Sequence, residues 1–141
     1  MVLVDQLTKT WAVRELQDRV VHVVWTLRLA LTKNTGSAFS FATGSGPVIA
    51  VIALVVVGFL LWTGRSVSTR LGAVALGLIA GGAIGNLADR MFRGAGFLRG
   101  GVVDFIDFRW WPVFNVADAA VVVGAILLLV LTWLDSNAQD A

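Results

Sequence analysis

Three long runs of apolar residues stand out along the chain. Residues 48–62 contain no polar side chain, while residues 71–87 and 116–134 carry a few polar side chains near their ends. A bilayer core about 30 Å thick requires about 20 helical residues. With a few neighbouring residues each run reaches that length, so the pattern predicts three membrane-spanning helices. A buried core helix is the alternative for residues 48–62.

The second run contains glycines at a regular spacing of four residues, at Gly77, Gly81 and Gly85. Residues four apart lie on one face of a helix, and small residues allow another helix to approach closely. The second span is therefore predicted to present a packing face. The spacing does not indicate which helix covers that face.

The first forty residues follow a different pattern. Along residues 25–32, apolar and polar side chains alternate with one break at Ala30, which is typical of a strand exposed on one side. Asn34 and Gly36 then flank a turn, so we expect a small sheet on the membrane face. Near the beginning, only residues 1–4 precede Asp5, and such a short apolar stretch cannot span a membrane.

Composition supports a membrane protein and narrows the chemistry. The 141 residues are 57% hydrophobic and 14% charged, against about a quarter charged in soluble domains. There is no cysteine and only one histidine, His22. These counts exclude a disulfide scaffold, a thiolate zinc site and a cysteine nucleophile, and they leave no histidine-rich metal site. The basic residues are scattered, so nucleic acid is not expected as a partner. Acid–base chemistry must come from carboxylates.

Asp118 lies three residues into the third apolar run. A charge at the centre of a bilayer costs at least about 2.5–3.5 kcal/mol, and less towards the interface, so this carboxylate is a candidate functional residue. The alternative is a role at the beginning of the helix. Asp in a first turn favours the positive end of the helix dipole, and Asn115 is a good N-cap residue.

The connection between the second and third runs, residues 88–112, contains three more carboxylates, Asp89, Asp104 and Asp107. Two carboxylates within hydrogen-bond reach do not both ionise readily, so one remains protonated while the other acts as a base. Such a pair can activate water and protonate a leaving amine. The residues alone do not choose a partner for Asp118, because Asp89 with Arg90 and Asp107 with Arg109 are equally candidates for surface ion pairs.

Five blocks of sequence together resemble the lipoprotein signal peptidase family, also called signal peptidase II. In chain order they are residues 5–9 (DQLTK), 34–40 (NTGSAFS), 85–90 (GNLADR), 102–108 (VVDFIDF) and 114–118 (FNVAD). The resemblance implies an intramembrane aspartic endopeptidase that removes the signal peptide from diacylglyceryl-modified prolipoproteins, cutting before the lipidated cysteine. It implies an all-α membrane protein, a four-helix transmembrane bundle with a small extracytoplasmic β-sheet cradle.

The resemblance also implies residue roles. Asp104 and Asp118 would form the catalytic dyad, with Asp89 and Asp107 as supporting residues. The substrate-binding residues would be Asn34, Gly36, Asn86, Arg90, Asn115 and Asp5, the last near the end of the first helix. No cofactor or metal is implied. The expected partners are the prolipoprotein substrate and membrane lipids, and the chain is expected to be a monomer.

Placed on this sequence, the resemblance predicts a single domain over residues 1–141. Its spans would be residues 1–16 in part, 47–63, 71–88 and 116–134, with the surface sheet over residues 20–42. The first span is expected to be truncated, because the family's first helix has an apolar stretch before the residue equivalent to Asp5. Residues 39–41 would complete the cradle.

The distribution of basic residues and the resemblance predict opposite orientations. Two basic residues, Arg65 and Arg70, lie at the end of the bundle away from the proposed site. Nine lie at the site end: Lys9, Arg14, Arg19, Arg28, Lys33, Arg90, Arg93, Arg99 and Arg109. The positive-inside rule alone would place the site in the cytoplasm, whereas the resemblance implies the outer face of the bacterial inner membrane. We expect the outer face, with several cations binding site groups or lipid headgroups.

Two other functions fit parts of the pattern. A small transporter or channel subunit could relay protons through Asp118 and oligomerise through the glycine face. A structural membrane anchor would tolerate Asn at each of the four aspartates. Neither accounts for the five blocks.

Overall fold

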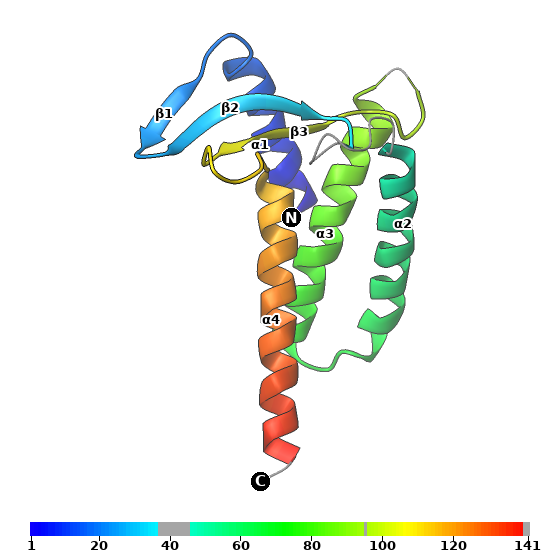
Figure 1. The fold of residues 1–141 in the computed structure, drawn as a ribbon. Helices are drawn as coiled ribbons and strands as arrows, with labels where there is room; N and C mark the ends of the chain where they lie inside the picture. The colour runs from blue at the N-terminus through cyan, green and yellow to red at the C-terminus, as the bar shows by residue number, and fades with distance from the viewer. Residues whose placement is uncertain (37–45, 95, 140–141) are drawn as a thin grey trace.

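The computed structural model describes residues 1–36, 46–94 and 96–139. Three long helices run side by side away from a small sheet at one end of the molecule (Figure 1). They are α2 (Gly46–Thr63), α3 (Arg70–Phe92) and α4 (Val116–Gln139). All three are long and apolar enough to cross a membrane, so helices of sufficient length lie where the three spans were predicted. At the end opposite the sheet, the 3-10 turn η1 (Gly64–Ser66) follows α2 and leads towards α3.

Helix α3 is longer than the sequence pattern indicated. It continues through Phe92, so Asp89 and Arg90 lie in its last turns and not in the connection to the third span. Both side chains are buried. This extension of α3 places Asp89 and Arg90 beside the sheet, where Asp89 accepts the backbone N–H of Val103.

The first helix, α1 (Val2–Glu15), is short and packs beside α3 and the sheet (Figure 1). It has 14 residues and is not among the three helices of span length in the described chain. Its buried side follows helical spacing: Asp5, Lys9 and Ala12, continued by Leu16 just beyond its end. Asp5 and Lys9 are therefore charged residues on the buried face of a short helix, and they require polar partners there.

Glycines allow α3 to approach two neighbours closely. A Cβ atom at Gly81 would lie 2.6 Å from the Cβ of Met1, and one at Gly85 would meet the Asp5 carboxylate, so these two glycines face α1. Gly77 has open space around it. On another face of α3, a Cβ at Gly82 would lie 2.5 Å from the carbonyl oxygen of Ala117 in α4. The predicted glycine face is thus covered by α1 at two of its three positions.

The sheet contains three antiparallel strands in the order β1-β2-β3, namely β1 (Val21–Val24), β2 (Leu27–Asn34) and β3 (Val102–Asp107). The predicted surface strand is confirmed from Leu27 onwards. Trp25 is not part of it, because this residue takes a left-handed conformation (φ 52°) in the turn between β1 and β2. Residues 37–42 of the predicted sheet lie outside the described residues.

Strand β3 was not anticipated, and it carries two of the aspartates. In the antiparallel register Thr32 of β2 lies opposite Asp104, and Arg28 lies opposite Asp107. Val103 and Phe105, on either side of Asp104, pack against Ala12 and Leu16. Since side chains alternate along a strand, this packing turns Asp104 to the other face, away from the apolar cluster.

Candidate active site

A cavity of about 380 Å³ lies between α2, α3, α4 and the sheet and is lined by half of the expected site residues. Its apolar wall is formed mainly by side chains from α2, α3 and α4: Ile49, Ala50, Ala53, Ala83, Leu87, Val121 and Val122, with Val102 from β3. Its polar lining consists of Asn34, Asn86, Arg90, Asp104 and Asp118. The two aspartates therefore meet in one cavity, although Asp104 is on a strand and Asp118 is on a helix.

Asn115 connects the two carboxylates. Its side-chain amide donates to Oδ1 of Asp104 at 2.6 Å, and its backbone N–H donates to Oδ2 of Asp118 at 3.1 Å. In return the backbone N–H of Asp118 donates to the Asn115 side-chain oxygen at 3.0 Å. This reciprocal pair caps α4. The helix-start role and a place in the site are thus compatible for Asp118.

Two further asparagines complete the hydrogen bonds to the carboxylates. The Asn34 amide donates to Oδ2 of Asp104 at 3.1 Å, and the Asn86 amide donates to Oδ1 of Asp118 at 2.7 Å. Asn115 also donates to the Asn86 oxygen at 3.1 Å. Each carboxylate therefore accepts two N–H donors, and both are joined in one network of amides.

The environment of Asp104 favours its protonated form. Burial of the carboxyl and the nearby negative charge of Asp118 raise the pKa of Asp104 to about 6. Hydrogen bonds from Asn34 and Asn115 and the charge of Lys9 act in the opposite direction and lower that pKa. The net result is an acid whose pKa lies close to the working range of a protein, as general acid–base catalysis requires.

Asp107 lies outside the cavity, at the end of β3. It accepts hydrogen bonds from Nε of Arg28 at 2.7 Å and from the backbone N–H of Arg109 at 2.6 Å. Burial alone would raise the pKa of Asp107, but these bonds and the charges of Arg28 and Arg109 outweigh it and lower the pKa. The Asp107 ion pair is therefore formed with Arg28 across the sheet, instead of with the neighbouring Arg109 side chain.

Asp89 is fully buried beneath the sheet and does not pair with Arg90. Its oxygens lie 3.0 Å from Nζ of Lys9 and 2.8 Å from Nε of Arg93. It also accepts the backbone N–H of Val103 at 3.0 Å. Asp89 thus anchors β3 from below, one residue away from Asp104.

Asp5 and Gly36 occupy supporting positions near the cavity. Asp5 lies in the first turn of α1, and not near its end, and its side chain is completely buried. It accepts the backbone N–H of Ala117 at 3.2 Å and does not line the cavity. The N–H of Gly36 donates to the Asn34 side chain at 3.0 Å, with φ 107°. This conformation favours glycine, and the turn orients Asn34 towards Asp104.

Arg90 lines the cavity, and one of its guanidinium nitrogens has no bond among the described residues. Its side chain is buried, and its Nη1 atom has no hydrogen-bond partner in that part of the chain. An unpaired buried guanidinium donor is costly. Such a donor is suited to a ligand oxygen.

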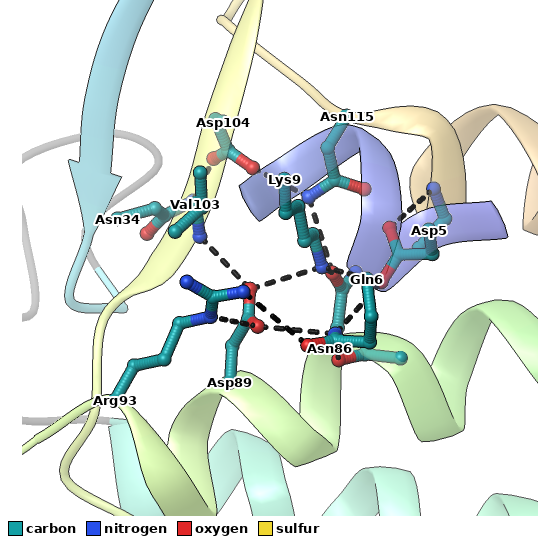
Figure 2. Close-up of polar contacts among 12 residues, drawn as sticks. Asp5, Gln6, Lys9, Asn34, Asn86, Asp89, Arg93, Val103, Asp104 and Asn115 are labelled. Carbon is teal, nitrogen blue, oxygen red and sulfur yellow. Dashed lines mark hydrogen bonds and ion pairs between the residues drawn. The ribbon is translucent and has the colours of Figure 1, made fainter. Parts of the chain in front are cut away.

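Three residues without an individual role in the sequence predictions, Gln6, Lys9 and Arg93, lie in the polar network behind the cavity and bind Asp89. Figure 2 shows Lys9 between Asp5, Asn86 and Asp89, with Gln6 and Arg93 beside them. The signal present in the sequence was the spacing of Asp5 and Lys9, four residues apart on one helix face. Within the described residues, no cluster of three or more carboxylates and histidines is arranged to hold a metal ion.

Comparison with known proteins agrees with this geometry. A family model described as Signal peptidase (SPase) II matches residues 1–134. The chain belongs to the signal peptidase II family. This places it among the membrane proteases that remove signal peptides from prolipoproteins.

Lipoprotein signal peptidases of several bacteria are similar over most of this chain. The lipoprotein signal peptidase of Mycobacterium leprae (strain Br4923) is 48% identical over 134 residues, which cover 94% of this chain and 67% of that protein. That of Mycobacterium avium (strain 104) is 49% identical, over 94% of this chain and 74% of that protein. For the enzyme of Mycolicibacterium smegmatis the identity is 48%, and the chain spans 57% of its length.

Solved structures share the fold. A bacterial membrane enzyme solved by the in meso method at 2.3 Å resolution superposes with a TM-score of 0.84 and 26% sequence identity, covering 98% of this chain and 85% of that one. A second, solved at 1.9 Å resolution, superposes with a TM-score of 0.78 and 27% identity over 93% of this chain and 86% of that one. The helical bundle with its small sheet is thus the architecture of a signal peptidase II and of membrane enzymes similar to it.

Proposed function

We propose that this signal peptidase II cuts diacylglyceryl-modified prolipoproteins just before the lipidated cysteine, with Asp104 and Asp118 as its catalytic dyad. The observation that carries this proposal is that both carboxylates border one cavity and are held by the same residue, Asn115. No other pair among the aspartates of the described residues lines this cavity.

In the proposed reaction a water molecule binds between the two carboxyl groups. Asp118, as carboxylate, removes a proton from the water while the oxygen attacks the scissile carbonyl carbon. The protonated Asp104 then gives its proton to the departing nitrogen, the C–N bond breaks, and the products are a carboxylic acid and an amine. Asp104 is suited to the acid role because burial and the charge of Asp118 raise its pKa to about 6. The reaction requires no cofactor or metal.

The cavity suits a lipid-bearing peptide. Asn34 and Arg90 line the cavity, and their side-chain N–H groups are the donors proposed to bind the peptide's carbonyl oxygens. Apolar residues of α2 and α4 form the wall, and a second, apolar hollow of about 320 Å³ beside Trp111 and Phe114 also reaches Asp118. Substrate would enter from the bilayer through this apolar surface.

We place the chain in the bacterial cell membrane as a single multi-pass domain and a monomer, with the site on the outer face. The count of basic residues opposes this orientation, because nine lie at the site end and two, Arg65 and Arg70, at the other. Lys9, Arg28 and Arg93 are ion-paired with Asp89 or Asp107, so they are structural charges. Without these three, six basic residues at the site end still stand against two. The proposed orientation therefore rests on the family and not on the positive-inside rule.

Because the chain has no cysteine, single cysteines can report this orientation. A cysteine replacing the fully exposed Trp25 should react with a membrane-impermeant maleimide in intact cells. One replacing Arg65, at the opposite end of the bundle, should react only after permeabilisation. The reverse pattern would place the site in the cytoplasm.

The test of function is cleavage of a diacylglyceryl-modified prolipoprotein in liposomes by the wild-type chain, Asp104→Asn and Asp118→Asn. General acid–base groups contribute about 100- to 10,000-fold to rate, so each variant should lose turnover by at least that factor while keeping its thermal unfolding. Asp135→Asn, at an exposed position in α4, is the matched control and should cleave normally. Wild-type turnover by Asp104→Asn would disprove the dyad. Proton flux without cleavage would favour the transporter.

A further inference from the structure

Lys9 is a buried cation below the proposed dyad. Its side chain is completely excluded from solvent. Its ammonium nitrogen lies 2.7 Å from Oδ1 of Asn86, 2.9 Å from Oδ2 of Asp5 and 3.0 Å from Oδ2 of Asp89. An ammonium has three donors, so these three oxygens use all of them. Figure 2 shows the Lys9 side chain reaching from α1 into this group.

The first of the three contacts fixes the orientation of the Asn86 amide. With its oxygen towards Lys9, Asn86 presents its NH₂ group to Asp118 at 2.7 Å. If the amide were turned over, its NH₂ group would face the ammonium and its oxygen would face the carboxylate, and both contacts would repel. Lys9, together with the Asn115 amide that donates to the same oxygen at 3.1 Å, therefore selects the orientation in which Asn86 can donate to Asp118.

The other two contacts each lead to the backbone beside one member of the dyad. Asp5 accepts the N–H of Ala117, the residue before Asp118. Asp89 accepts the N–H of Val103, the residue before Asp104. Lys9 is thus linked through the Asp5 side chain to the beginning of α4 and through the Asp89 side chain to β3.

We propose that Lys9 is a positioning residue of the peptidase, which holds the Asn86 amide and the backbone beside both aspartates in the reactive arrangement. It does not touch the substrate cavity. This inference rests on the proposed function of Asp104 and Asp118. It adds a requirement for the cation from α1, a helix shorter than a membrane span.

The charge of Lys9 also reaches the dyad. Charged groups near Asp104 are Asp118 from α4, Arg90 from α3 and Lys9 from α1, and the polar Asn34 approaches it from β2. The positive charge of Lys9 lowers the pKa of Asp104. If this charge is removed, the pKa of Asp104 rises further, and the acid form persists to higher pH.

The test compares Lys9→Met with Arg14→Met, which removes a cation from an exposed position of the same helix. Prolipoprotein cleavage is followed in liposomes over a range of pH. Since misplacement of reacting groups by about 1 Å can cost about 100-fold, kcat of Lys9→Met should fall by that order while KM changes little. The decline of its activity at alkaline pH should move to higher pH. Arg14→Met should match the wild type in kcat, KM and pH profile.

A double variant, Lys9→Met with Asp5→Asn, addresses the case in which the single variant fails to fold. It removes one positive and one negative charge together, and leaves Asp89 paired with Arg93 at 2.8 Å. An Asn at this position keeps an oxygen for the N–H of Ala117. We expect thermal unfolding close to that of the wild type, with kcat still reduced about 100-fold by misplacement of the dyad.

Three results would overturn the proposal: a wild-type kcat in either folded variant, an unchanged pH profile in folded Lys9→Met, or failure of both variants to fold. The last would make Lys9 a residue of stability alone. Asp104→Asn, measured in parallel, separates the two proposals, because cleavage by that variant would disprove the dyad whatever Lys9 does.

Discussion

The two sides of helix α3 are built in opposite ways. On the side of α1, glycines bring the two backbones together, and the contact ends in buried ion pairs among Asp5, Lys9 and Asp89. On the side of α2, small residues such as Ala53 of α2 and Ala83 of α3 line the cavity. One side is filled by charged and polar groups bonded to each other, while the other is open and mostly apolar.

This difference separates two tasks of a membrane peptidase. The two carboxylates must be held at fixed positions, which requires a rigid polar network. A lipid-bearing substrate must also enter the site, which requires apolar space. The asparagines that hold the dyad lie at the junction between the sides: Asn86 contacts Lys9 on one side and lines the cavity on the other. Changes on the α1 side should therefore affect folding and kcat, and changes on the α2 side should affect substrate binding.

The largest effect is expected from Gly85→Leu, which disrupts the packing of α1 against α3. The new side chain would collide with the Asp5 carboxylate and separate α1 from α3. Disruption of a buried ion pair costs about 3–5 kcal/mol, so we expect loss of the folded state at physiological temperature and no cleavage. Thermal unfolding in detergent measures this. Gly77→Leu, on the same helix with open space around it, should unfold like the wild type. Equal stability of the two variants would contradict the close packing.

The sequence predicted the apolar spans and the cap of α4, but not the polar network between α1 and α3. Apolar runs predicted α2, α3 and α4 because a bilayer requires a simple length of hydrophobic residues. The spacing of Asn115 and Asp118 indicated the cap of α4, since that interaction is local. The identity of the dyad came from resemblance, because the residues alone left Asp89, Asp104 and Asp107 equal.

The missed features all depend on contacts between distant segments. Strand β3 shows no alternation because most of its side chains are buried on both faces, and its partner β2 is far away in the sequence. An ion pair of Asp89 with its neighbour Arg90 was one of the alternatives left open. On a helix, however, the residue four positions on lies alongside, and Arg93 is the observed partner. Lys9 could not be placed before the approach of α1 to α3 was known.

The polar side also predicts a pH dependence. The pKa of Asp104 is raised to about 6 by burial and by the charge of Asp118, and the proposed mechanism needs its protonated form. The protonated fraction falls as pH rises through this value, and above it kcat/KM should decrease about tenfold per pH unit. Initial rates in liposomes measure this decrease. They are taken between about pH 5 and pH 8, a range that brackets the pKa of about 6, with protein integrity checked at each pH. Activity that stays constant over that interval would exclude Asp104 as the acid.

The apolar side can be narrowed without disturbing the dyad. Ala53→Trp places a large ring in the cavity wall, so substrate should bind more weakly, and kcat/KM should fall about tenfold, a loss of about 1.4 kcal/mol. Thermal unfolding should change little, because the ring enters empty space. Val55→Trp, on the exposed side of α2, is the matched control and should cleave normally. A larger effect of Val55→Trp than of Ala53→Trp would move substrate entry to another face.

The smallest expected effect is at Asp107, which lies on neither side of α3. Asp107→Asn removes the negative charge and keeps one side-chain oxygen, which can still accept from either Arg28 or the Arg109 N–H. Because Arg28 is about one-third exposed, solvent screens this pair, and we expect a loss of up to about 1 kcal/mol. The pKa of Asp107 is lowered in the folded state, so the pair's contribution is present at neutral pH and disappears as pH falls through that pKa. The difference in thermal unfolding between wild type and variant should therefore shrink in acid, while kcat/KM at neutral pH changes by about twofold or less. A loss of cleavage as large as that of Asp104→Asn would bring Asp107 into the catalytic machinery, and the rigid polar side would then extend along the whole of β3.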